Sequence, residues 1–176
     1  MMLKVKTMSG QVKSSKIMSS PSRFLILQSK VSCLGSKLKP MKTEAAIYPR
    51  TTDEYLILFI IAALTKGVST FKGISDLANK ESSRAYEMKK ILKQIGVKCK
   101  LSKNEMKIFG KGMIDASDKK IIVENLGDHR IAMCSFILAI LTNAKTTIKN
   151  FETVFTSSPS FLKIMKSLGA KFEIQK

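Results

Sequence analysis

One short stretch gathers residue types that could bind an anion. The sequence NLGDHRIAMCSF, residues 125–136, places the single histidine of the chain, His129, between Asp128 and Arg130 and directly before an apolar run. Asp128 is expected to cap a helix there, which puts His129 and Arg130 on its first turn. A cation at a helix N-terminus opposes the helix dipole, so Arg130 needs an anionic partner. A bound carboxylate or phosphate would meet that need.

A second charged stretch is NKESSRAYEMKKILKQIG, residues 79–96. The spacing of Lys80 and Arg84 predicts that they share a face of a helix's first turn, with Glu81 beside Arg84. From spacing alone, a solvated helix with a surface ion pair is favoured over a site. Arginine is scarce, however, and two of the four in the chain lie in these two stretches: Arg23, Arg50, Arg84 and Arg130.

An internal repeat predicts the elements that position these residues. The stretch DEYLILFIIAALTKGVSTFKG (53–73) is similar to DHRIAMCSFILAILTNAKTTIKN (128–150), and each reads as an acid-led apolar helix followed by a strand. Asp53 and Asp128 are both expected to cap their helices. Three further stretches, at 30–39, 91–101 and 164–174, read as a helix end, a glycine in the left-handed cap and a strand. The repeating unit is helix, strand, helix, strand.

Length and composition indicate one soluble domain or slightly more. The chain has 176 residues, of which 44% are hydrophobic, which suffices for a core. Residues 1–16 lack the apolar core of a signal peptide, and the longest apolar runs are too short to span a bilayer. Three cysteines without ligand spacing and one histidine cannot form a zinc set. We therefore expect a cytoplasmic protein without membrane attachment or metal.

The charge of +18 raises the alternative of a non-enzymatic basic module that binds nucleic acid or another polyanion. Residues 1–43 contain nine cations and no acidic residue, which is half of the net charge. Nucleic-acid surfaces usually place aromatic residues or arginines among the lysines, and this segment has one phenylalanine and one arginine. Nucleic acid is therefore the less favoured partner.

Taken together, the motifs resemble those of the 5-enolpyruvylshikimate-3-phosphate synthase family. KESSR (80–84) and GDHRIAM (127–133) are similar to two signatures of that family, in its order. PRTTDEYLILFIIAALTKG (49–67) and SSPSFLKIMKSLGAKFEI (157–174) match two further segments, and SGQVKS (9–14) matches a third more weakly. The resemblance implies an α/β (α+β) fold of repeated helix and strand units, forming one domain of an inside-out α/β barrel. Residues 1–48 would be a remnant of the preceding domain or repeat, and residues 49–176 the C-terminal domain.

The resemblance also implies a reaction. The enolpyruvyl group of phosphoenolpyruvate would pass to the 5-hydroxyl of shikimate 3-phosphate, with release of phosphate and without a cofactor. Asp53 would take the hydroxyl proton, and Glu81 would deliver and remove the methylene proton, assisted by Lys80. Substrate binding would fall to Lys80, Arg84, Arg130, His129, Ser9 and Gln11, with both arginines on the carboxylate of phosphoenolpyruvate. Asp53 would also contact shikimate 3-phosphate.

Departures from the family pattern limit the expected activity. Thr156 stands where the family has a lysine, and Ser83 where it has an aspartate. The N-terminal segment whose lysine and arginine bind phosphoenolpyruvate in the family has no counterpart. We therefore expect a truncated homologue with weak or no activity alone. A separately encoded N-terminal half could complete the site, or the chain could be a degenerate remnant. The repeat pattern is weak in residues 16–50, and this favours the remnant.

Overall fold

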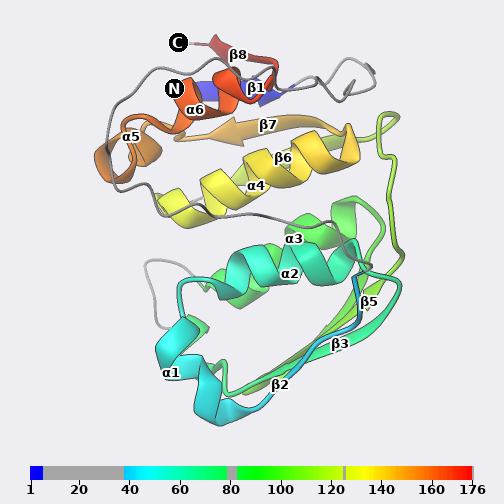
Figure 1. Ribbon diagram of the computed structural model, residues 1–176. Coiled ribbons are helices and arrows are strands. Elements are labelled where there is room, and N and C mark those ends of the chain that lie inside the picture. Colours follow the sequence, from blue (N-terminus) through cyan, green and yellow to red (C-terminus); the bar gives the residue numbers. More distant parts are fainter. Residues whose placement is uncertain (6–37, 79–82, 125, 176) are drawn as a thin grey trace, which may run out of the picture.

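The computed structural model has two four-stranded sheets with helices packed between them (Figure 1). The structure describes residues 1–5, 38–78, 83–124 and 126–175. Four residues expected to form part of the site lie outside these ranges: Ser9, Gln11, Lys80 and Glu81.

The first sheet has the order β2-β3-β5-β4. Its strands are β2 (Lys42–Thr43), β3 (Gly67–Lys72), β4 (Lys98–Leu101) and β5 (Glu105–Gly110). Strands β2 and β3 are parallel, and the other two pairs are antiparallel. The helical segments of this half are η1 (Ala45–Ile47), α1 (Tyr48–Thr51), α2 (Tyr55–Ala63), η2 (Ser75–Ala78) and α3 (Arg84–Gln94).

The second sheet has the order β6-β7-β1-β8. Its strands are β1 (Met2–Val5), β6 (Lys120–Glu124), β7 (Lys145–Lys149) and β8 (Phe172–Gln175). Strands β6 and β7 are parallel, and β1 is antiparallel to both β7 and β8. The helices of this half are α4 (His129–Thr142), α5 (Thr153–Ser157) and α6 (Phe161–Ser167).

The two sheets repeat one pattern, which confirms the predicted repeat. In each, a parallel pair joined by a buried helix is followed by two antiparallel neighbours. Strand β5 fills the third position of the first sheet, and β1, from the start of the chain, fills it in the second. The division of the chain at residue 48 remains a prediction, although strands β1 and β2 join sheets that later residues build.

Helices α2 and α4 are apolar on almost every side because they lie between the sheets (Figure 1). Helix α3 is amphipathic, with Met88, Ile91 and Leu92 buried and Tyr86 half exposed. Aromatic side chains fill both halves of the core. Tyr55, Phe59 and Phe71 pack edge to face beside the first sheet, and Phe136, Phe151 and Phe161 pack beside the second.

The predicted helix ends are confirmed at two of the three glycines. Gly96 follows α3 with φ of +80° and Gly169 follows α6 with φ of +90°, and a strand follows each. The third stretch, 30–39, lies almost wholly outside the described residues. The predicted start of α3 is wrong. Ser83 is the N-cap and Arg84 the first helical residue of α3, whereas Lys80 lies outside the described residues.

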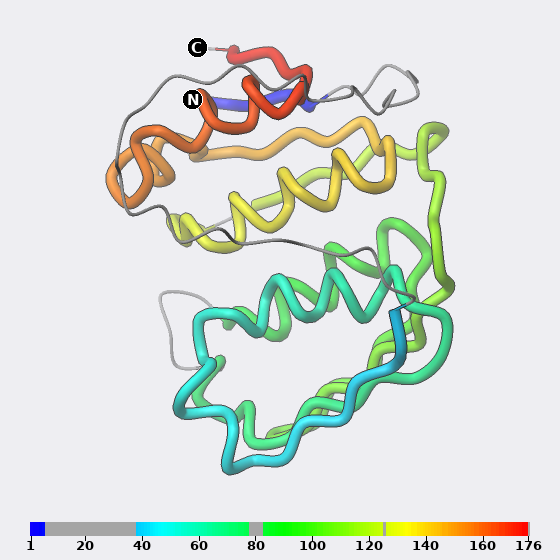
Figure 2. Tube along the Cα trace, in the orientation of Figure 1, coloured from blue at the N-terminus to red at the C-terminus, as the bar shows by residue number. Residues whose placement is uncertain are grey.

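Helices α2, α3 and α4 run in the same direction (Figure 2). This follows from the topology for α2 and α4, because each joins two parallel strands and must run opposite to both. Three helix N-termini therefore lie at one end of the molecule, where their dipoles favour negative charge. Arg84, at the start of α3, and Asp128 and Arg130, at the start of α4, lie at that end.

Candidate active site

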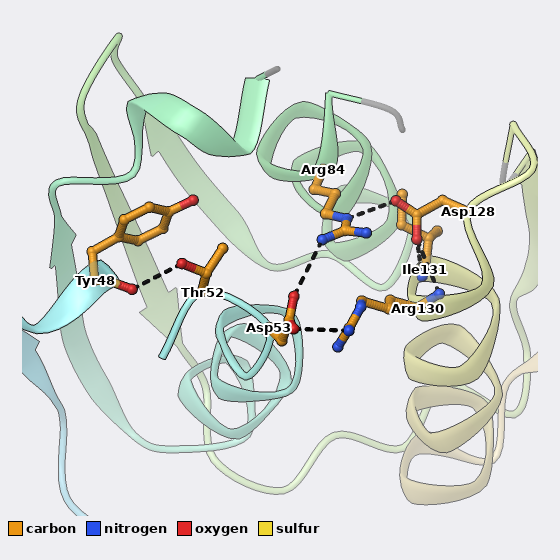
Figure 3. A network of polar contacts seen from close by, with 7 residues as sticks. All are labelled: Tyr48, Thr52, Asp53, Arg84, Asp128, Arg130 and Ile131. Carbon is orange, nitrogen blue, oxygen red and sulfur yellow. Dashed lines mark hydrogen bonds and ion pairs between the residues drawn. The ribbon is translucent and has the colours of Figure 1, made fainter. Parts of the chain in front are cut away.

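A buried ion pair joins the N-terminal ends of α3 and α4. The Nε of Arg84 donates to Oδ2 of Asp128 at 2.7 Å, and the two side chains are 2% and 0% exposed (Figure 3). A solvated helix face, which spacing alone favoured for Arg84, is therefore wrong. A charge removed from water requires a partner, and each of these groups supplies one for the other.

Asp128 also caps α4, as the sequence predicted. Its Oδ1 accepts hydrogen bonds from the backbone N–H groups of Arg130 (3.0 Å) and Ile131 (3.4 Å). The Asp128 carboxylate thus accepts hydrogen bonds from the backbone N–H groups of the first turn of α4 with Oδ1. With Oδ2 it orients the Arg84 guanidinium. The helix start and the guanidinium position are fixed by the same side chain.

Asp53 bridges the two arginines. Its Oδ2 accepts a hydrogen bond from Nη2 of Arg130 at 2.8 Å, and its Oδ1 lies 3.7 Å from Nη1 of Arg84 (Figure 3). The side chains of Asp53 and Arg130 are 51% and 33% exposed, so this part of the network faces solvent. The anionic partner that Arg130 was expected to need is supplied by the protein itself.

The expected capping role of Asp53 is not what the structure shows. The N-cap of α2 is Glu54, which makes no side-chain capping hydrogen bond, and Asp53 lies one residue earlier in a turn. The hydroxyl of Thr52 donates to the carbonyl oxygen of Tyr48 at 2.9 Å and ties this turn to α1. Attraction to two guanidinium groups draws the Asp53 carboxylate toward α3 and α4 instead of toward the amides of α2.

A shallow pocket of about 220 Å³ opens beside this bridge. It is lined by Asp53, Glu54, Ile57, Arg130, Met133 and Cys134. Burial, together with the nearby Asp128 carboxylate, raises the pKa of the Cys134 thiol to about 12. Cys134 therefore stays a neutral thiol at ordinary pH and forms an apolar part of the wall.

The arrangement brings together three of the expected site residues from three elements. Asp53 comes from the turn before α2, Arg84 from the start of α3 and Arg130 from the start of α4 (Figure 3). His129 is the first residue of α4 and is partly buried. Two guanidinium groups directed at one carboxylate, at the positive ends of three helices, form a geometry suited to binding a carboxylate or phosphate.

Comparison with known proteins identifies the family. The profile of the family described as EPSP synthase (3-phosphoshikimate 1-carboxyvinyltransferase) matches residues 2–165. The chain belongs to the EPSP synthase family. It is 31% identical over 138 residues to the 3-phosphoshikimate 1-carboxyvinyltransferase of Rhodopseudomonas palustris strain TIE-1, and 35% identical over 142 residues to that of Zymomonas mobilis. These alignments cover 78% and 79% of this chain.

Solved structures agree with the sequence comparison. The EPSP synthase of Acinetobacter baumannii superimposes with a TM-score of 0.71 and 30% identity over 80% of this chain. The enolpyruvyl transferase NikO of Streptomyces tendae shares the fold, with a TM-score of 0.55 and 14% identity. The expected fold of an enolpyruvyl transferase domain is confirmed.

The chain spans only about a third of these EPSP synthases. The matches cover 30% of the Rhodopseudomonas protein, 31% of the Zymomonas protein and 32% of the Acinetobacter chain. Among the described residues of this family member, no helix is long and apolar enough to cross a membrane. Nor does that part of the chain gather three or more histidine, cysteine or acidic side chains that could hold a metal ion.

Two features of the site were missed in the sequence. One is the pairing of Arg84 with Asp128, which lie 44 residues apart and meet only because α3 and α4 pack together. The other is the bridging position of Asp53. The scarcity of arginine was the one sequence feature that pointed to both, since it singled out Arg84 and Arg130.

Proposed function

We propose that this chain forms one wall of a 3-phosphoshikimate 1-carboxyvinyltransferase site and that Arg84 and Arg130 bind the carboxylate of phosphoenolpyruvate. The observation that carries the proposal is the Asp53 carboxylate, which both guanidinium groups already approach. A ligand carboxylate offers the same charge and shape. It would displace Asp53 from Arg130, while Asp128 keeps Arg84 in place.

In the proposed reaction, the 5-hydroxyl oxygen of shikimate 3-phosphate bonds to the enol carbon of phosphoenolpyruvate. The carbon–oxygen bond to phosphate then breaks, and phosphate leaves. Asp53, once released from Arg130, is placed to accept the hydroxyl proton. Glu81 would add a proton to the methylene carbon and later remove it, and Lys80 would bind shikimate 3-phosphate; both assignments rest on the family resemblance, as do those of His129, Ser9 and Gln11.

Activity of the chain alone is expected to be weak or absent. The described network leaves Asp53 about half exposed, and phosphoryl and carboxylate groups bind strongly only where water is excluded. We propose that a separately encoded N-terminal half would supply the missing cations. The family membership favours this reading over a basic module for nucleic acid.

Phosphate release from phosphoenolpyruvate and shikimate 3-phosphate tests the proposal. We expect slow or no release by the chain alone. Added in trans to the N-terminal part of the Acinetobacter enzyme, the chain should support release that requires both substrates and is lost in Glu81→Gln. Failure of the mixture, with both proteins folded and associated, would contradict a catalytic wall. Lys163→Gln, on the exposed face of α6, is the matched control and should leave the rate unchanged.

A further inference from the structure

A second cationic site lies at the opposite end of α3 from Arg84. The helix has 11 residues and is about 16 Å long, so its C-terminal turn is well separated from the arginine network. A pocket of about 410 Å³ opens there, lined by Lys89, Lys93, Gly96, Val97, Lys98 and Cys99. No acidic residue is among its lining.

Two more lysines, from the loop after β5, approach Gly96 at the edge of this pocket. The ammonium groups of Lys119 and Lys111 lie 3.2 and 3.3 Å from the point that a Cβ would occupy on Gly96. Both therefore approach the same small region, and any side chain at position 96 would displace them. Together with Lys89, Lys93 and Lys98 they make a cluster of five lysines, the Gly96 lysine cluster.

Within the part of the chain that the structure describes, none of these five lysines forms an ion pair with a carboxylate. Glu87, on the same helix, pairs instead with Lys90 at 2.6 Å. Lys98 lies over the ring of Phe109 at 5.5 Å, a contact that holds its ammonium group without neutralising it. Like charges gathered without a counter-charge repel one another, and a bound anion would remove that cost.

Capping of α3 does not account for the cluster. The carbonyl oxygens of Leu92 and Lys93 already accept hydrogen bonds from the backbone N–H groups of Val97 (3.0 Å) and Gly96 (2.9 Å). This is the arrangement in which a left-handed glycine ends a helix, and it needs no lysine. The helix dipole contributes about half a negative charge at this end, far less than five ammonium groups supply.

We propose that the Gly96 lysine cluster binds a small, multiply charged phosphate compound. Lysine ammonium groups suit phosphate because they act as compact charges with several donors. The pocket has the size of a small-molecule site, larger than one phosphate ion requires. Burial raises the pKa of the Cys99 thiol to about 11, so the wall beside the lysines is a neutral thiol and the site binds its ligand without covalent chemistry.

Calorimetric titration with inorganic diphosphate, at ionic strength matched with sodium chloride, tests the proposal. We expect saturable binding to the full chain that weakens about tenfold in Lys89→Gln/Lys93→Gln. Lys163→Gln/Lys166→Gln on α6 removes the same charge elsewhere and should leave the affinity unchanged. Arg130→Gln should also retain it, which separates this site from the one at the helix N-termini.

Any of these titration results would overturn the proposal: no saturable binding, equal weakening in the two lysine double variants, or loss of binding in Arg130→Gln alone. Equal weakening would mean that diphosphate only screens the overall charge. A measurement on the unaltered chain guards against a variant that does not fold. Diphosphate should shift the amide resonances of Gly96 and Val97 more than those of α4, and the reverse pattern would equally contradict the proposal.

Discussion

The two ion pairs of the site differ in exposure, and this difference divides their roles. Arg84 and Asp128 are fully buried at 2.7 Å, whereas Arg130 and Asp53 meet at 2.8 Å with a third and a half of their side chains exposed. The buried pair cannot separate without leaving a charge in the core. The exposed pair can open at little cost because water replaces the partner. We infer that the buried pair holds the site in shape and that the exposed pair is where a ligand enters.

The largest effect is expected from breaking the buried pair. Asp128→Asn removes the buried carboxylate that pairs with the Arg84 guanidinium at 2.7 Å, and we expect a loss of about 3–5 kcal/mol in the free energy of unfolding. Denaturant titration measures it. The matched variant Asp53→Asn, on the exposed pair, should lose less than about 1 kcal/mol. Equal losses would remove the distinction between the two pairs.

Replacing both members of the buried pair sharpens the comparison. In Arg84→Met/Asp128→Leu neither side chain of the former buried pair is charged, so the double variant should recover most of the stability lost in Asp128→Asn. A deficit of about 1–2 kcal/mol is expected to remain, because the cap of α4 is also gone. A double variant less stable than Asp128→Asn would show that packing, and not unpaired charge, dominates at this position.

The dependence of stability on pH tests whether water reaches the Cys134 thiol in the wall of the pocket beside Asp53. The pKa of Cys134 is raised to about 12 from an ordinary value of 9.0. Above pH 9 the unfolded thiol loses its proton while the folded thiol keeps it, so its contribution to stability falls as pH rises toward 12. The slope is about 1.4 kcal/mol per pH unit. Cys134→Ala should flatten the curve over that window relative to the parent chain. An unchanged slope would mean that water reaches the thiol.

Breaking the exposed pair of Arg130 and Asp53 is expected to change stability least. It should instead change the binding of phosphoenolpyruvate. Asp53→Asn removes the internal carboxylate that competes for Arg130, so phosphoenolpyruvate alone should bind several-fold more tightly. In the mixture with the N-terminal part of the Acinetobacter enzyme, turnover with both substrates should fall in the same variant, because the proposed proton acceptor is lost. Weaker binding of phosphoenolpyruvate would show that Asp53 orients Arg130 for the ligand and does not compete with it.

Local patterns predicted the elements well. The repeat of acid-led apolar helix and strand gave α2, β3, α4 and β7, and the glycines at 96 and 169 marked two helix ends correctly. These features depend on residues near in sequence, where caps and periodicity act directly. The start of α3 was misplaced because a favourable charge spacing at Lys80 and Arg84 was taken for helix.

The arrangement of the site depended on contacts that no local pattern encodes. Asp53 and Asp128 head corresponding repeat units and were given the same role, yet only Asp128 caps its helix. The difference arises because α3 places Arg84 between the two units, with Asp128 on one side and Asp53 on the other. The place of β1 in the second sheet is likewise set by pairing with strands more than 140 residues away.

The most direct test of the account is calorimetric titration of phosphoenolpyruvate into the chain and into Arg130→Lys. Lysine keeps the charge but loses the planar fork, so a site built on two guanidinium groups should bind about tenfold more weakly in the variant while its stability stays within about 1 kcal/mol. Equal affinity in the two proteins, or no binding to the parent chain, would contradict the claim that Arg84 and Arg130 together receive the ligand carboxylate.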